Sequence, residues 1–170
     1  GATAGQGGSL LKNGTGTQAL SIGDNTSKKQ FRSILSFDTS PSSISANAEI
    51  VGASLSLRRG YSSVAGSFGS LVADIKTGTF GTATLEITDF QAEASATNVI
   101  PSFPIPAVNE ELTEGELVSS SLKYISRTGQ TQFRIRFQSA TDNDNNGDIL
   151  GFYSGENTTA NIPILTVRYG

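Results

Sequence analysis

Short runs in which apolar and polar residues alternate recur along the whole chain, separated by Gly, Asn, Asp and Pro. Such alternation is typical of β-strands that have one face in a core and the other in water. The clearest run covers residues 132–138, where three apolar residues alternate with two arginines: Phe133, Ile135 and Phe137 with Arg134 and Arg136. We therefore expect the apolar side chains in the core and both arginines in solvent.

The same pattern predicts seven or eight strands. The runs that carry it are residues 19–22, 31–37, 50–57, 71–76, 132–138, 149–153 and 164–169. Strands of this number in a 170-residue chain predict an all-β fold, a jelly-roll-like antiparallel β-sandwich with one or two short helices. No repeat or linker divides the chain, so we expect one domain over residues 9–170. Residues 1–8 contain no large apolar side chain and are predicted to form a flexible N-terminal arm.

Two segments depart from strand alternation. Thr113 is followed three residues later by Glu116, and Leu117, Leu122 and Ile125 then recur at helical spacing. This capping-box pattern predicts a helix over residues 114–125. A second short helical turn is expected over residues 88–93. Residues 100–106 contain three prolines, which lack an N–H, so we expect an extended connection there and no strand.

The composition excludes several classes of enzyme. The chain contains no His and no Cys. This removes Ser–His triads, His-based zinc sites and thiolate nucleophiles. A cluster of acidic residues, Glu110, Glu111, Glu114 and Glu116, could supply paired carboxylates, but acids at a predicted helix N-terminus are explained by the helix dipole. We therefore predict that the protein is not an enzyme.

The charge, hydropathy and composition of the chain indicate which partners and which location to expect. The formal net charge is −3 and only 16% of residues are charged, with no basic stripe, so no nucleic-acid partner is expected. No apolar run approaches the ~20 residues that span a bilayer. Abundant Ser, Thr, Gly and Asn with few Lys and Glu favour an extracellular or cell-surface location. Asn13, Asn25 and Asn157 begin glycosylation sequons, which matter only if the host modifies its surface proteins.

The segment 141–149 carries the densest set of metal-ligating oxygens. Its residues match positions 1, 3, 5 and 6 of an EF-hand-type loop, with Gly147 at the sharp turn. The twelfth position is Tyr153, where that loop has a bidentate Glu, and the flanking runs predict strands. The alternative is a polar hairpin, since Asn-Gly is a strong turn signal. If a cation binds, we expect weakly bound calcium, with the ligands Asp142, Asp144, Asn146 and Asp148.

Several segments, in order, resemble one family of extracellular domains. Residues 32–38 read Arg-Ser-Ile-Leu-Ser-Phe-Asp, and residues 50–57 follow the form Ile-x-x-Ala-x-Leu-x-Leu. Residues 72–82, 132–137 and 152–155 add weaker similarity. The chain resembles the DNRLRE-type domains, which are related to carbohydrate-binding module family 96. The resemblance implies a jelly-roll sandwich on secreted or surface proteins, often with glycan binding, although the Trp common in that family is missing here.

Two functions remain open. The first is a non-catalytic subunit of an extracellular filament, sheath or surface matrix, assembled through strand edges as a homo-oligomer or polymer. In that assembly the arm, with Leu10 and Leu11, would lie against a neighbouring copy. The alternative is a non-catalytic carbohydrate-binding module with a polysaccharide partner.

Overall fold

The computed structural model describes residues 10–12, 14–40, 45, 47–158 and 160–170; the arm predicted over residues 1–8 lies outside them. The described residues form ten strands and two short 3₁₀ helices. The strands are β1 (Leu20–Asp24), β2 (Gln30–Phe31), β3 (Ser33–Asp38), β4 (Ile50–Ser62), β5 (Leu71–Thr77), β6 (Ala96–Phe103), β7 (Leu112–Glu116), β8 (Gln130–Phe137), β9 (Asp148–Phe152) and β10 (Ile164–Tyr169). The helices are η1 (Ile87–Gln91) and η2 (Ser119–Tyr124).

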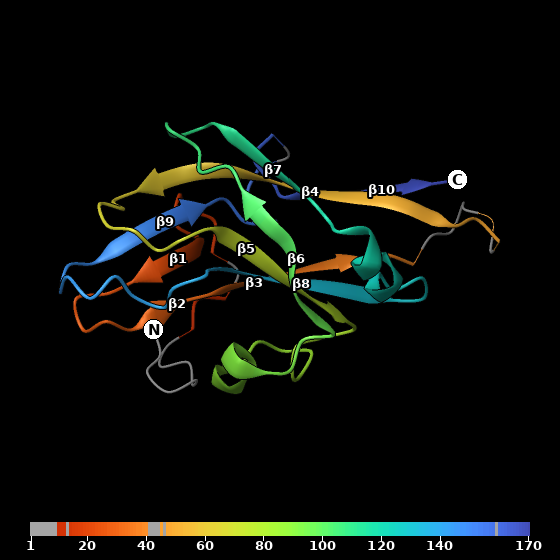
Figure 1. Ribbon diagram of the computed structural model, residues 1–170, viewed down its shortest axis with the longest axis horizontal. Coiled ribbons are helices and arrows are strands. Elements are labelled where there is room, and N and C mark those ends of the chain that lie inside the picture. Colours follow the sequence, from red (N-terminus) through yellow and green to blue (C-terminus); the bar gives the residue numbers. More distant parts are fainter. Residues whose placement is uncertain (1–9, 13, 41–44, 46, 159) are drawn as a thin grey trace.

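The strands form two packed antiparallel sheets (Figure 1). One sheet has the order β10-β4-β9-β1-β2, with β7 also paired to β4, and the other has the order β3-β8-β5-β6. Along the chain, successive strands or strand pairs alternate between the two sheets, which is the jelly-roll arrangement. The predicted all-β sandwich is therefore confirmed.

The core lies between the sheets and takes side chains from both. Phe133, Ile135 and Phe137 of β8 are buried there, as their alternation predicts. Leu55, Leu150 and others face them from the opposite sheet. At roughly 25 cal/mol per Å² of buried apolar surface, such a core stabilises the domain without any disulfide.

The prediction of a helix over residues 114–125 is wrong in its first half. Thr113 and Glu116 belong to β7, where they pair with Leu57 and Ser54 of β4, and the Thr113 hydroxyl donates to the Pro104 carbonyl. Pairing with β4 satisfies the backbone groups that a helix would have satisfied. Only η2 remains helical, and η1 overlaps the second predicted turn. Within the described part of the chain, neither helix has the length and apolar character needed to cross a membrane.

The prediction of an extended connection over residues 100–106 is wrong for residues 100–103, which belong to β6. Strand β6 runs through Pro101 as far as Phe103. It lies at the edge of its sheet, where it pairs only with β5, and the register shifts twice along that pair. An edge strand with bulges tolerates a proline because the missing N–H can face away from the ladder.

The two arginines of β8 do not face solvent, contrary to the alternation. Arg134 is only 5% exposed, because residues 78–95, including η1, cover the outer face of its sheet. Its guanidinium donates to the Asp74 carboxylate and to the carbonyls of Phe90 and Ala92. The covering segment therefore turns an outward-facing strand position into a buried one.

Candidate metal centre

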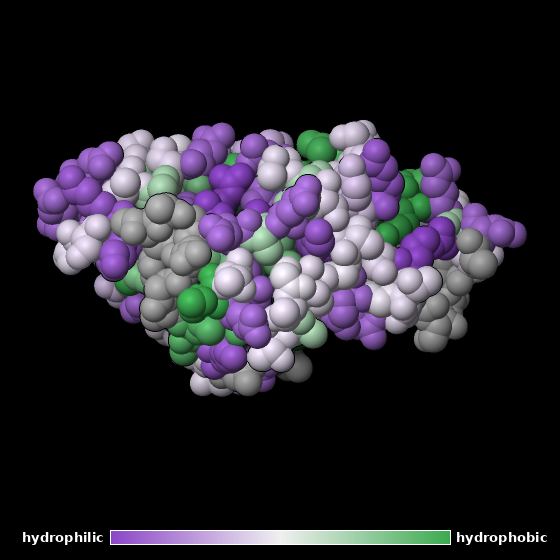
Figure 2. Space-filling view, turned by 90° about the horizontal axis from the view of Figure 1, so that it is seen from below, coloured by the Kyte–Doolittle hydropathy of each residue, from purple (hydrophilic) through white to green (hydrophobic). Residues whose placement is uncertain are grey.

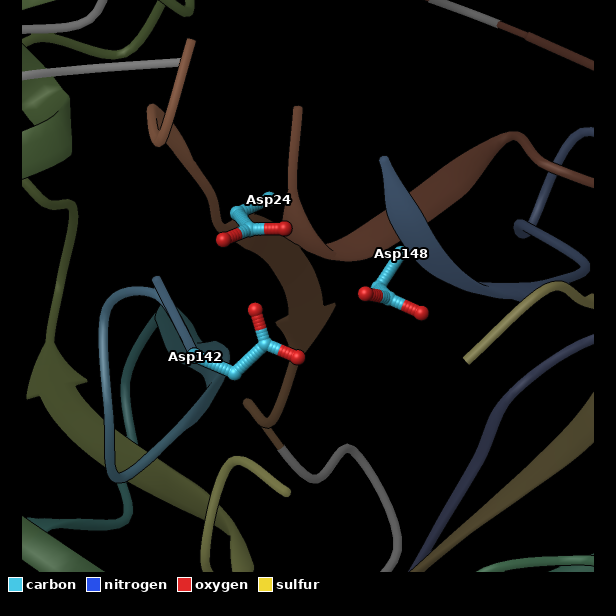
Figure 3. A group of neighbouring side chains, drawn as sticks. All are labelled: Asp24, Asp142 and Asp148. Carbon is cyan, nitrogen blue, oxygen red and sulfur yellow. The ribbon is translucent and has the colours of Figure 1, made fainter. Parts of the chain in front are cut away.

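Three carboxylates converge where β1 ends and β9 begins. Asp24 is the last residue of β1, Asp148 is the first of β9, and Asp142 lies in the loop between β8 and β9. One oxygen from each lies within 4.8 Å of the others. Figure 3 shows the three carboxylates directed toward a shared space.

Strand pairing holds two of these carboxylates side by side. Asp24 and Asp148 are direct partners in the antiparallel ladder between β1 and β9. The preceding residue, Gly23, has φ +128°, and a Cβ there would collide with the Asp148 carbonyl oxygen. Only glycine permits this backbone conformation and this close approach, so Gly23 is required for the geometry of the pair.

The third carboxylate reaches the group through a gap left by a second glycine. A Cβ on Gly66, in the loop after β4, would collide with the Asp142 carboxylate. Burial and the negative charges of Asp144, Asp148 and Asp24 raise the pKa of Asp142, outweighing a hydrogen bond from the Asp144 N–H. None of the ion pairs among the described residues involves the three aspartates of the group.

Two oxygens of the group are buried without a partner. Asp24 and Asp148 are each 1% exposed. The Ala65 N–H donates to Asp148 Oδ1, but Asp148 Oδ2 and Asp24 Oδ1 accept no hydrogen bond from any described residue. A buried carboxylate oxygen without a partner costs several kcal/mol, roughly, relative to one that is satisfied. A cation between these oxygens would remove that penalty, so the group could hold a metal ion.

The donor set determines the class of metal. All the available ligands are oxygens, since the chain contains no His and no Cys. Oxygen ligands favour hard cations such as calcium, magnesium and manganese over zinc or copper. The site is therefore suited to a hard divalent cation.

The structure brings together only part of the ligand set predicted from sequence. Asp142 and Asp148 belong to the group, and Asp24 joins them although the sequence indicated it only as the end of a strand. Asp144 and Asn146 are exposed, and the side chain and N–H of Asn146 both donate to the Asp144 carboxylate, at 2.8 and 2.7 Å. Their role as ligands stays a prediction. The register that pairs Asp24 with Asp148 is the signal that would have identified the missing ligand.

The residues predicted to mediate assembly lie on the surface. Leu10 is 42% and Leu11 61% exposed. Leu11 lines a groove of about 430 Å³ beside β3, the edge strand that pairs only with β8. Figure 2 shows apolar surface on the face that carries the first described residues and η1.

The asparagines of two of the three glycosylation sequons lie in the described part of the chain. Asn25 and Asn157 are half-buried, and each side chain makes hydrogen bonds to the backbone. Asn13 lies outside the described residues. Glycosylation at these positions stays a prediction.

Comparison with known proteins does not assign the chain to a family. No family model matches it, and no curated protein matches it. The similarity to DNRLRE-type domains therefore rests on the segments given above and stays a prediction.

Proposed function

We propose that this protein is a non-catalytic, calcium-stabilised structural module of a secreted or cell-surface assembly. The observation that carries the proposal is the pair of buried carboxylates, Asp24 and Asp148, with oxygens that no described residue satisfies. Their place at the junction of β1, β9 and the β8–β9 loop suits an ion that holds segments together. A stabilising ion in a chain without His or Cys supports a structural role over a catalytic one.

Calcium is the cation that this donor set favours. Three aspartates supply at least one oxygen each, and backbone carbonyls or waters can complete the six to eight oxygens that calcium takes. Magnesium demands a stricter octahedron and usually keeps several waters. Sites in extracellular modules bind calcium with Kd of roughly 10⁻⁴–10⁻³ M, so a weak site suits the extracellular location predicted from composition.

Assembly would use the exposed edge beside the N-terminal segment. Among the described residues β3 is an edge strand of its sheet, and Leu10 and Leu11 offer apolar surface next to it. A strand from a neighbouring copy could pair there and bury the two leucines.

Carbohydrate binding is the second candidate function. The 430 Å³ groove beside β3 is lined by hydroxyl and amide side chains, among them Ser36, Thr82, Thr84 and Gln132. Such groups can hydrogen-bond to sugar hydroxyls. The resemblance to DNRLRE-type domains supports the same function.

Calcium titration tests the metal site. At a calcium concentration about 100 times Kd, a native-state site adds about 2.7 kcal/mol of stability. For a domain of this size that raises Tm by roughly 5–10 °C relative to EDTA. Asp148→Asn should lose this increase, while in EDTA it should be at least as stable as wild type because it removes one charge from a crowded group. Differential scanning calorimetry with and without calcium measures both effects.

Asp144→Asn is the matched control, because it makes the same change in the loop that precedes Asp148, outside the three-aspartate group. It should keep the calcium response if Asp24, Asp142 and Asp148 are the ligands. A response lost in both Asp144→Asn and Asp148→Asn would favour the ligand set predicted from sequence. A Tm that calcium does not change in wild type would refute the site.

Truncation and a glycan array separate the two functions. If the chain assembles through its N-terminal segment, removing residues 1–11 should leave a folded protein that no longer polymerises, as seen by light scattering and negative-stain microscopy. A full-length chain that stays monomeric at high concentration and binds one glycan specifically would favour the carbohydrate-binding module instead.

A further inference from the structure

Three arginines lie near Asp74 on the outer face of the four-stranded sheet, and two of them form ion pairs with it. Arg134 donates twice to Asp74 Oδ2, at 3.1 Å, and Arg136 donates to both oxygens of Asp74, at 3.0 Å. Arg32, between β2 and β3, completes the cluster. Burial and the positive charges of Arg134 and Arg136 lower its pKa to about 10, against a smaller opposite effect of Asp74. Three guanidiniums and one carboxylate leave an excess of positive charge.

Arg32 is positioned by the segment that covers the sheet. Its guanidinium lies 4.3 Å from the centre of the Phe90 ring, and its Nη1 donates to the Phe90 carbonyl at 2.8 Å. Its Nε donates to Gln30 Oε1 at 2.9 Å. Among the described residues nothing accepts a hydrogen bond from Nη2, so an oriented guanidinium keeps a donor for a ligand.

A hollow of about 230 Å³ opens on Arg32 and Arg134. Apart from the two arginines, its walls are largely apolar, with contributions from Leu10, Leu11, Phe31, Ile34, Ile87 and Phe90. Of the described acidic residues only Glu86 lines it, and Glu86 is exposed and forms no ion pair. The hollow therefore joins positive charge to apolar surface.

We propose that this hollow is a binding site for a small carboxylic acid with an apolar body. The carboxylate would accept hydrogen bonds from the Arg32 guanidinium, which suits the geometry of carboxylates. The apolar body would lie against the leucine, isoleucine and phenylalanine walls. A polyhydroxylated sugar fits less well, because its hydroxyls would face these walls without partners. The site is separate from the metal group, and it shares Leu10 and Leu11 with the surface proposed for assembly.

Matched six-carbon probes test the proposal. Full-length ¹⁵N-labelled protein is titrated with hexanoate, hexanol and hexylamine, and backbone amide shifts are followed by NMR. Hexanoate should give saturable shifts at residues 31–34 and 85–90, with Kd at least tenfold lower than for the neutral or cationic probe. Equal binding of hexylamine or hexanol, or shifts scattered over the surface, would overturn the proposal.

Substitutions at Arg32 identify the group that recognises the carboxylate. Arg32→Gln should weaken hexanoate binding at least tenfold, and Arg32→Lys should also weaken it, because lysine keeps the charge but not the guanidinium held against Phe90. Arg127→Gln is the control, since Arg127 donates to the carbonyls of Ala48 and Ser45 and does not line the hollow. Unchanged binding in a folded Arg32→Gln variant would overturn the assignment. If Arg32→Gln does not fold, unchanged hexanoate binding in Arg32→Lys would overturn it instead.

Discussion

Aspartates at two places in this protein are equally buried, but the charges that surround them have opposite signs. Asp74 is 1% exposed, as are Asp24 and Asp148. Asp74 accepts hydrogen bonds from two guanidiniums and from the Asn98 N–H. Asp24 and Asp148 face another carboxylate, and each keeps an oxygen without a partner among the described residues. Hydrogen bonds and ion pairs within the chain balance the charge of Asp74, whereas a cation would be needed to balance the second group.

The pKa of one carboxyl at each place shifts in the direction that the neighbouring charges predict. Burial alone would raise the pKa of Asp74, but hydrogen bonds from Arg136 and Asn98 and the charges of Arg136 and Arg134 outweigh it, and the pKa falls below its ordinary value. Burial and neighbouring carboxylates raise the pKa of Asp142. Burial by itself therefore does not predict the direction of a pKa shift. The charges of the neighbouring groups decide it.

The largest expected effect comes from removing the acid of the balanced group. Asp74→Asn leaves Arg134 buried without its counter-ion, which should lower the free energy of unfolding by about 3–5 kcal/mol. Urea denaturation measures this loss, which should be the same in calcium and in EDTA. Asp38→Asn, an exposed change in the same sheet, should have no measurable effect. A loss that calcium restores would show that the two groups are coupled, contrary to the comparison.

The ion pair between Asp74 and Arg134 should also make the stability of the protein sensitive to acid, which is a smaller effect. Because the pKa of Asp74 is lowered in the folded state, its contribution is complete above the unfolded value of about 3.9 and is lost as pH falls through the lower folded value. Wild type should therefore lose stability between about pH 4 and pH 2 more steeply than Asp74→Asn. Urea midpoints measured across this range provide the test. Parallel curves for the two proteins would contradict the assignment.

The smallest effect is expected where charges are paired in solvent. Arg168 of β10 pairs with Glu116 of β7 across β4, but the two side chains are 47% and 57% exposed. Arg168→Gln should cost less than about 1 kcal/mol, and added salt should reduce the difference. A loss as large as that of Asp74→Asn would show that burial does not separate these pairs.

The alternation of apolar and polar residues was sufficient to predict which side chains of a strand face the core. Phe133, Ile135 and Phe137 face the interior as predicted, because a period of two places every second side chain on one face. The same local reasoning failed at Thr113 and Pro101. There, pairing with β4 and a position at the sheet edge decided the backbone, and neither can be read from neighbouring residues.

The candidate metal site likewise has residues that the sequence indicated and residues that only the fold brought together. The spacing of aspartates and asparagines in one loop indicated Asp142 and Asp148, since alternate oxygens in a tight loop can face one cation. Asp24 entered the group only through the register of β1 and β9, and Gly23 and Gly66 matter only because folded segments pass so close to them.

By itself the sequence determined the fold class, the composition of the core strand β8 and the lack of His and Cys chemistry, because these depend on residue type and short-range periodicity. Only the tertiary structure decided which charges are buried together. Arg134 is covered by a segment more than 40 residues away in sequence, as its bonds to Phe90 and Ala92 show. Such contacts form between distant segments, so their charge balance is a property of the folded chain.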